Sequence, residues 1–152
     1  VKRINVETAL QMLAACEQAL PADIGVFAAA VADWRAEASA QKTKKSKSGQ
    51  PSFNWVENPD ILATIAQSDQ RPRLTVGFAA ETQDLEKNAE AKLKRKGCDW
   101  IVANDVSLGT STFGGADNQV KIVTQAGVED LPIMAKEQVA TVLVDRMIQA
   151  LA

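Results

Sequence analysis

The sequence predicts an α/β fold, in which helices flank a mostly parallel β-sheet, and three observations support this. Short apolar runs alternate with longer amphipathic segments along the chain, as expected when strands are followed by crossover helices. Polar turns bound the apolar runs, which fits strands covered on both faces. The 152 residues are 46% hydrophobic, enough for one domain with a buried core.

The first predicted elements are a strand, a helix and a second strand. Residues 1–6 are a short candidate strand, and residues 7–20, ETALQMLAACEQAL, have the spacing of an amphipathic helix. Thr8 and Gln11 fit a capping box at its start. Residues 23–33, DIGVFAAAVAD, predict a buried strand despite their alanines. The apolar stripe predicted for the helix consists of Leu10, Leu13, Ala14 and Leu20.

A weaker strand and a short helix follow. Residues 52–58, SFNWVEN, alternate weakly between polar and apolar side chains, which predicts a strand near a sheet edge. Residues 58–70 predict a helix with Asn58 as its N-cap. Pro59 then occupies the first helical position and Asp60 lies in the first turn.

Predicted strands and helices alternate more clearly in the second half of the chain. Residues 73–80 predict a strand, and residues 81–97 predict a helix that is acidic at its start, basic at its end and stopped by a glycine. Residues 98–105 predict another buried strand. Residues 118–133 predict a β-hairpin, and residues 135–152 predict the last helix.

These elements predict a Rossmann-like, mostly parallel sheet flanked by helices, with a C-terminal β-hairpin. A doubly wound sheet usually begins with a strand and a glycine-rich turn that binds phosphate. No Gly-x-Gly-x-x-Gly or Walker-type sequence occurs in this chain. We therefore expect residues 1–152 to form a single domain whose N-terminal unit is missing.

Composition excludes several classes of function. The net charge of −2 gives no general attraction to nucleic acid or to anionic lipid, and the apolar runs are too short to span a membrane. Cys16 and Cys98 form no metal or redox motif, which favours reduced thiols and a cytoplasmic location. Histidine is absent, so histidine-based triads, the usual zinc sites and a histidine general base are excluded. Chemistry that depends on positioning and on neutralising charge, such as transfer at a phosphate, is favoured.

Three predicted strands end in the same format. Each apolar run narrows to alanine and then reaches a carboxylate, at Asp33, Glu81 or Asp105. Ligands of open parallel sheets bind outside the carboxyl ends of the strands, so three such ends at one edge predict a site. Taken one at a time, each end is more simply explained as an ordinary transition from strand to loop.

Basic residues gather in two places. Residues 41–50, QKTKKSKSGQ, include Lys42 and are either a solvated loop or a flexible basic flap that closes over phosphates. Lys92 and Lys96 are four residues apart and share a helix face, where they either complement the helix C-terminus or bind an anion. The start of the helix at Asn58 is a better anion site, because free N–H groups point outward there.

The motifs, taken in order, resemble a known family. The sequence AAVADW is followed nine residues after its aspartate by KTKK, then by NPDI, GFAAET, the two lysines at 92 and 96, and ANDVS. This order is similar to that of phosphopantothenate–cysteine ligase, the phosphopantothenoylcysteine synthetase domain of the bacterial bifunctional coenzyme A biosynthesis protein. The motifs extend from about residue 24 to residue 107.

The resemblance implies a ligation driven by CTP and a divalent cation, Mg²⁺ or Mn²⁺. The family converts 4′-phosphopantothenate into an acyl-cytidylate with release of pyrophosphate, and the amino group of L-cysteine then displaces CMP. The resemblance also implies a homodimer, usually fused behind a flavin-dependent decarboxylase. FMN belongs to that decarboxylase and is not expected in this chain.

Carried over by position, the resemblance implies a CTP site and explains the small residues in residues 26–34. The alanines would admit the nucleotide to the end of the strand, and Asp33 would accept hydrogen bonds from it. Lys42 is the candidate with a possible catalytic role, and no metal ligand is assigned. The implied CTP-binding residues are Ala29, Asp33, Lys42, Pro59, Asp60, Ile61, Leu62, Phe78, Lys92 and Lys96.

The chain departs from the family pattern in three respects. It lacks the glycine-rich first turn and the later asparagine that acts on the acyl intermediate, so we expect this chain to bind CTP without completing the reaction. Ala36 replaces the proline usual two residues after the tryptophan, and the flap is one residue shorter than usual.

The implied site raises a question of geometry, and other functions stay open. A helix that begins near Thr82 would place Lys92 about 15 Å along its axis, so a tilted helix, an extended triphosphate or a dimer partner would have to close the gap. The alternative functions are an NAD(P)-type Rossmann-like binding module and a non-catalytic dimerisation fragment in which residues 52–58 pair across a two-fold axis.

Overall fold

A five-stranded mixed sheet forms the centre of the protein, in the order β1-β4-β5-β7-β8. The computed structural model describes residues 1–37, 53–107 and 115–152. The strands are β1 (Ile24–Phe27), β4 (Leu74–Glu81), β5 (Trp100–Asp105), β7 (Val120–Thr124) and β8 (Gly127–Asp130). The first three strands are parallel, and the hairpin β7–β8 adds to β5 in antiparallel orientation. The predicted α/β, Rossmann-like sheet with a C-terminal hairpin is confirmed.

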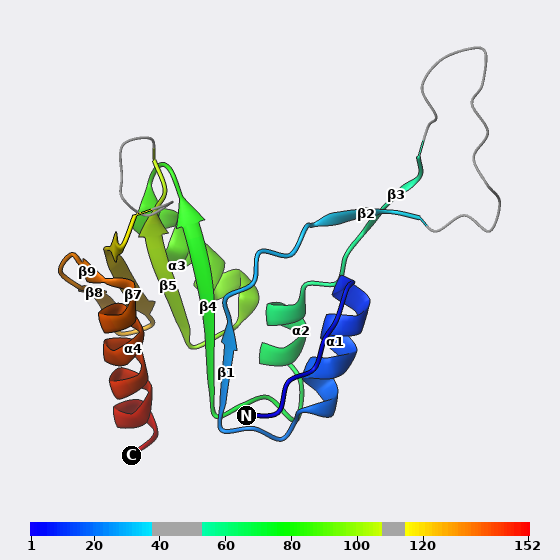
Figure 1. Cartoon of the computed structure of the whole chain (residues 1–152), viewed down its shortest axis with the longest axis horizontal. Helices are drawn as coiled ribbons and strands as arrows, with labels where there is room; N and C mark the ends of the chain where they lie inside the picture. Colours follow the sequence, from blue (N-terminus) through cyan, green and yellow to red (C-terminus); the bar gives the residue numbers. More distant parts are fainter. Residues whose placement is uncertain (38–52, 108–114) are drawn as a thin grey trace, which may run out of the picture.

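Helices cover both faces of the sheet (Figure 1). One face packs against α2 (Ile61–Ala66) and α3 (Leu85–Lys96), which contribute Leu62, Ala89 and Leu93 to a buried cluster. The other face packs against α4 (Lys136–Leu151), whose buried residues are Val139, Leu143 and Met147. The remaining helix, α1 (Ala9–Gln18), contacts α2. Among the described residues, no helix has the length and hydropathy that crossing a membrane would require.

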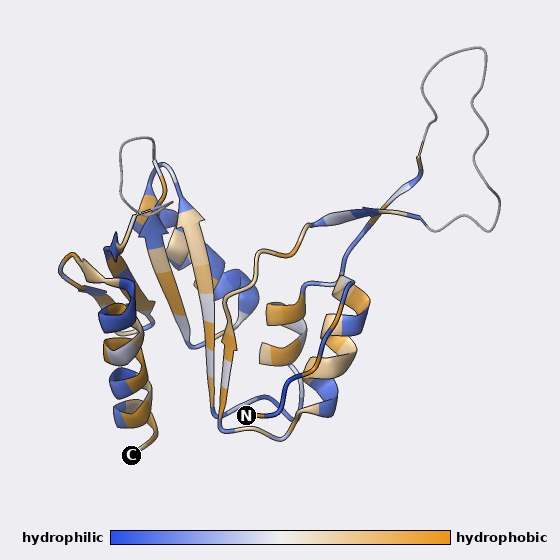
Figure 2. Ribbon diagram, viewed as in Figure 1, coloured by the Kyte–Doolittle hydropathy of each residue, from blue (hydrophilic) through white to orange (hydrophobic). Residues whose placement is uncertain are grey.

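The helix boundaries agree with the sequence where local signals are strong. Thr8 caps α1, and its capping box with Gln11 is present as predicted. The predicted apolar stripe is only partly correct, because Leu10 and Ala14 are exposed and α1 has no buried residue. The helix α3 ends at Gly97, which adopts a left-handed conformation with φ of 67°. Figure 2 shows this helix as mostly hydrophilic, in keeping with its few buried side chains.

Three predictions about the first half of the chain are wrong. Residues 1–6 pair with no other described strand and are not a strand. The strand predicted over residues 23–33 ends at Phe27 and is at most half-buried, because β1 is the edge strand of the described sheet. The helix predicted from Asn58 begins at Ile61, with Asp60 as its N-cap. Local composition permits the predicted state in each case. The lack of a paired strand among the described residues decides the first two cases, and the Asp60 cap decides the third.

Past the end of β1 the chain leaves the sheet. Residues 28–33, here called the alanine loop, connect β1 to a two-stranded antiparallel ribbon that extends away from the sheet in Figure 1. The ribbon consists of β2 (Trp34–Ala36) and β3 (Trp55–Glu57). The strand predicted over residues 52–58 therefore exists, but its described partner is β2 in the same chain. A second small ribbon joins β6 (Asp117–Asn118) to β9 (Met134–Ala135) beside α4.

Candidate functional site

Lys92 reaches from α3 to the backbone of β4. Its ammonium group is half-buried and donates a hydrogen bond to the Phe78 carbonyl oxygen at 2.9 Å. Because α3 begins at Leu85 and packs along the sheet, the helix itself brings Lys92 to the strand. Lys92 thus lies beside Phe78, three residues before the end of β4, and its reach to a nucleotide stays a prediction.

The Phe78 carbonyl is available because β1 ends early. In a parallel sheet, successive residues of a strand direct their hydrogen bonds to alternate neighbours. The Leu74 N–H donates to Asp23 on the β1 side, and the Thr75 carbonyl accepts from Asp99 on the β5 side. Even-numbered residues of β4, including Phe78, therefore face β1, which stops at Phe27 opposite Gly77. A stretch of β4 backbone beyond that point is left for other groups to bind.

A second lysine from the same helix face holds the start of α2. Lys96 forms a hydrogen-bonded ion pair with Asp60, and its own carbonyl accepts a hydrogen bond from Gln67 at 3.3 Å. Asp60 also accepts a hydrogen bond from the Ala63 N–H at 3.1 Å, which makes it the cap of α2. The ion pair and the cap together fix the position of Asp60 relative to α3.

The surroundings of Asp60 and Lys92 lower the pKa values of both side chains. Burial raises the pKa of Asp60, but Lys96 and the Ala63 N–H lower it by more, so the carboxyl stays ionised below its ordinary range. Burial, followed by the positive charge of Lys96, lowers the pKa of Lys92, although the carboxylate of Glu81 opposes this shift. The ammonium group of Lys92 is thus partly shielded from water and lies near the positive charge of Lys96.

Close packing places α2 against β4. A Cβ atom on Gly77 would lie 2.5 Å from Leu62 Cδ2 and 3.0 Å from Ile101 Cδ1. Glycine at this position therefore allows the first turn of α2 to rest directly on the strand. The structure thus brings together six of the residues implied by the resemblance, which are Asp60, Ile61, Leu62, Phe78, Lys92 and Lys96.

The alanine loop is tied to the segment that precedes α2. Ala29 and Asp33 are exposed, and the loop is joined to the segment before α2 by a hydrogen bond from the Asn58 N–H to the Asp33 carbonyl at 2.7 Å. Pro59 is next to Asn58 in the chain. Ala29 and Asp33 thus lie on a loop that is tied to the start of α2, rather than at the end of a strand.

The prediction that three carboxylates share one sheet edge is only partly correct. Glu81 and Asp105 lie opposite each other at the ends of β4 and β5. The Ser107 hydroxyl joins these ends by donating to the Thr82 carbonyl at 3.0 Å. Asp33 is not at this edge, because β1 ends six residues before it and the alanine loop carries it to the β2–β3 ribbon.

Two expected features cannot be placed. Lys42 and the basic flap of residues 41–50 lie outside the described residues. The described ranges contain no group of three or more Asp, Glu or Cys side chains that could hold a metal ion. The cluster as described carries the charges of two lysines and one carboxylate.

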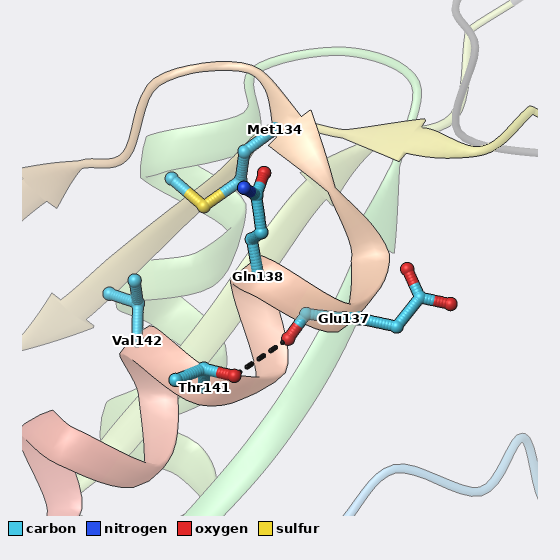
Figure 3. Close-up of a pocket in the computed structure, with 5 residues that line it drawn as sticks. All are labelled: Met134, Glu137, Gln138, Thr141 and Val142. Carbon is cyan, nitrogen blue, oxygen red and sulfur yellow. Dashed lines mark hydrogen bonds between the residues drawn. The ribbon is translucent and has the colours of Figure 1, made fainter.

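A depression elsewhere on the surface has different chemistry. It lies between β9 and α4, has a volume of about 460 Å³ and is lined mainly by apolar atoms (Figure 3). Its lining residues are Met134, Glu137, Gln138, Thr141 and Val142. The hydroxyl of Thr141 is bonded to the Glu137 carbonyl at 3.0 Å within the helix. None of the described residues implied for the CTP site is among those that line this depression.

The sequence interpretation did not assign Arg35 or the actual role of Asn58. The Asn58 side chain donates to the Ala32 carbonyl at 2.8 Å and accepts from Arg35 at 3.2 Å. The predicted N-cap role for Asn58 is wrong because its amide makes these distant contacts and Asp60 caps the helix. No local pattern signals a contact between residues 26 positions apart.

Comparison with known proteins shows the family to which this chain belongs. The family model described as "DNA/pantothenate metabolism flavoprotein C-terminal domain" matches residues 1–151. A coenzyme A biosynthesis bifunctional protein CoaBC from Vibrio cholerae is 41% identical over 93% of this chain, and one from Escherichia coli K12 is 40% identical over 97%. The chain spans 36% and 37% of the length of these two relatives.

A solved structure supports the same relationship. The crystal structure of the C-terminal domain of a coenzyme A biosynthesis bifunctional protein CoaBC is 30% identical and superposes with a TM-score of 0.72. The match covers 97% of this chain and 67% of that one. A DNA/pantothenate metabolism flavoprotein from Streptococcus pneumoniae, 15% identical with a TM-score of 0.71, shares the fold.

Proposed function

The chain belongs to the family of DNA/pantothenate metabolism flavoprotein C-terminal domains, and from this premise we propose that it binds CTP for a ligation step of coenzyme A biosynthesis. The ligation joins 4′-phosphopantothenate to L-cysteine. The observation that carries the proposal is the contact of Lys92 and Lys96 with Phe78 and Asp60. Residues chosen from the sequence for one ligand thus meet at one place, although they come from three separate elements.

The proposed reaction has two steps: the cytidylyl group passes from pyrophosphate to a carboxylate, and the acyl group then passes from CMP to an amine. The carboxylate of 4′-phosphopantothenate attacks the α-phosphorus of CTP, and pyrophosphate leaves with the bonding electron pair. The amine of cysteine then attacks the acyl carbon, loses a proton, and releases CMP. Charge collects on phosphate oxygens in both steps, so fixed cations at those oxygens lower the barrier.

The lysines suit the triphosphate. An ammonium group has three N–H donors, and Lys92 uses one of them on the Phe78 carbonyl. The other two are left for phosphate oxygens. Lys96 is paired with Asp60, which holds its ammonium group near the start of α2. Both lysines would thus act as positioned charges, which is the main requirement for transfer at phosphorus.

The opposite side suits the nucleoside. Small side chains on the alanine loop leave room for a flat base or a ribose near the chain, and the Asp33 carboxylate can accept hydrogen bonds from hydroxyl or amino groups. The backbone of β4 beyond Gly77 supplies further polar groups on the side that β1 leaves open. Lys42 would close on the phosphates from the flap.

The divalent cation is proposed to arrive with the triphosphate. Mg²⁺ is often held by one or two carboxylates together with substrate phosphates, and the described residues fit this mode better than a protein-only site, since they form no cluster of three ligands. The cation would neutralise phosphate charge. The homodimer, the fused decarboxylase with its FMN, and a cytoplasmic location also belong to this proposal.

A thermal-shift panel tests the proposed ligand. CTP, ATP, GTP and NADPH are each added with magnesium, and the unfolding temperature of the chain is measured. The proposal predicts that CTP raises the temperature most. Stabilisation by NADPH alone would favour an NAD(P)-type binding module, and no stabilisation by any nucleotide would favour a non-catalytic dimerisation fragment.

A further inference from the structure

The alanine loop has little packing of its own. Of residues 28–33, Val31 is half-buried and the others are exposed. The loop has left the sheet after Phe27, so ladder hydrogen bonds no longer define its path. Its position must therefore come from contacts with another segment.

Asn58 supplies these contacts. Its backbone N–H donates to the Asp33 carbonyl at 2.7 Å, and its side-chain Nδ2 donates to the Ala32 carbonyl at 2.8 Å. Its Oδ1 accepts from the Arg35 guanidinium at 3.2 Å. The same nitrogen of Arg35 also donates to the Glu57 carbonyl at 2.5 Å, which ties Arg35 to β3. Both ends of the Asn58 amide are thus engaged.

Asparagine matches these partners better than other residue types. A carbonyl can only accept and a guanidinium can only donate, so the residue between them needs one donor and one acceptor. Aspartate would keep the contact with Arg35 but would face the Ala32 carbonyl with a second acceptor. Alanine would lose both side-chain contacts.

The connection from Asn58 to the lysine side is short and stiff. Only Pro59 separates it from Asp60. Proline fixes its own φ and holds the preceding residue in an extended conformation. Asp60 in turn caps α2 and pairs with Lys96. The hydrogen bonds of Asn58 therefore set the distance between the alanine loop and the Asp60–Lys96 pair.

We propose that Asn58 is a positioning residue, which holds the nucleoside side of the CTP site at a fixed distance from its phosphate side. This inference rests on the proposed function. The backbone hydrogen bond to Asp33 fixes the loop near its end, and the side chain fixes it one residue earlier. Loss of the side chain leaves the lysines and the backbone hydrogen bond to Asp33 in place and frees the loop at Ala32.

Two ligands separate this role from a general effect on folding. CTP engages both sides of the proposed site, whereas inorganic tripolyphosphate offers only the phosphate part. Asn58→Ala should weaken CTP binding about tenfold, because the loop must be ordered at the moment of binding, and should leave tripolyphosphate affinity within about twofold. Both dissociation constants are measured by calorimetry on the full chain with magnesium.

Asn54→Ala is the matched control. Asn54 lies at the β2–β3 ribbon, and its side chain donates to Glu37 at 3.3 Å without contacting the alanine loop. This variant should bind both ligands as the unmodified chain does. Asn58→Asp, which has the same size and keeps the contact with Arg35, should reproduce the selective loss of CTP affinity and serves if Asn58→Ala folds poorly.

Three results would overturn the inference. Equal CTP affinity in Asn58→Ala, Asn58→Asp and the unmodified chain would show that the contacts do not position the site. An equal loss for CTP and tripolyphosphate would show that Asn58 only maintains the fold. Failure of the unmodified chain to bind CTP would reject the proposed function itself, and the inference with it.

Discussion

The contact between Gly77 and the first turn of α2 makes a quantitative prediction about stability. Gly77→Ala would place a methyl group 2.5 Å from Leu62 Cδ2 and 3.0 Å from Ile101 Cδ1. Leu62 and Ile101 are buried, so the new methyl group finds no free space. Either Leu62 moves and carries the start of α2 with it, or the strand shifts.

The expected change in the free energy of unfolding is the difference between two opposing effects. Overpacking a core typically costs about 1–3 kcal/mol, whereas replacing glycine by alanine stabilises by about 0.4–1 kcal/mol through the unfolded chain. The variant should therefore lose about 1–2 kcal/mol of unfolding free energy. For a chain of this size, that loss corresponds to a fall of about 2–8 °C in the unfolding temperature.

Urea unfolding followed by far-UV circular dichroism measures this loss, and a double-mutant cycle tests its cause. Leu62→Ala alone should cost about 2–5 kcal/mol because it leaves a cavity. The added methyl of Gly77→Ala occupies part of that cavity in the double variant. The combined loss should thus be smaller than the sum by at least about 1 kcal/mol. Additive losses, or a Gly77→Ala variant as stable as the parent, would refute the packing argument.

Three further predictions concern single side chains. Because the pKa of Asp60 is lower in the folded chain than its ordinary value of 3.8, its contribution to stability is complete above that value and is lost as the pH falls through the folded pKa. Asp60→Asn should remove this part of the pH dependence of unfolding, and an unchanged profile would contradict the ion pair with Lys96. Burial raises the pKa of Cys98 to about 11, so iodoacetamide at neutral pH should modify Cys98 only after unfolding, and mass spectrometry that finds it modified in the folded chain would contradict this burial. If Lys42 closes on the triphosphate, Lys42→Ala should weaken CTP binding and reduce the dependence of affinity on salt, whereas a solvated loop lysine would leave both unchanged in calorimetry.

The fold could be predicted where local signals and tertiary contacts agree. The helix α3 has acidic residues at its start, basic residues at its end and a glycine stop, and all of these are properties of the segment itself. The runs that became β4 and β5 are apolar enough to be buried whichever strand lies beside them.

The wrong predictions concern segments whose structure depends on residues far away in the sequence. The alanines after Phe27 are compatible with either a strand or a loop, and the early end of β1 determines the outcome. The short strand β2 has only three residues, and its partner β3 lies about twenty residues further along the chain. Asn58 has the composition of an N-cap, but its side chain is bound by Ala32 and Arg35.

The resemblance implied a set of residues for the candidate site, and their geometry could not be predicted. It implied both lysines of one helix face, yet it could not show that Lys92 would bind the Phe78 carbonyl. That contact depends on the packing of α3 along the sheet and on the early end of β1.

Calorimetric titration of the chain with CTP and magnesium tests the central claim most directly. The account predicts that CTP binds more tightly than ATP. It also predicts that Lys92→Met weakens CTP binding by at least about tenfold, since a hydrogen bond to a charged group contributes about 1.5–3 kcal/mol. Lys94→Met, an exposed lysine on the same helix, should leave the affinity unchanged. Equal affinities for CTP and ATP, or equal effects of the two substitutions, would contradict a CTP site built on Lys92, Phe78, Asp60 and Lys96.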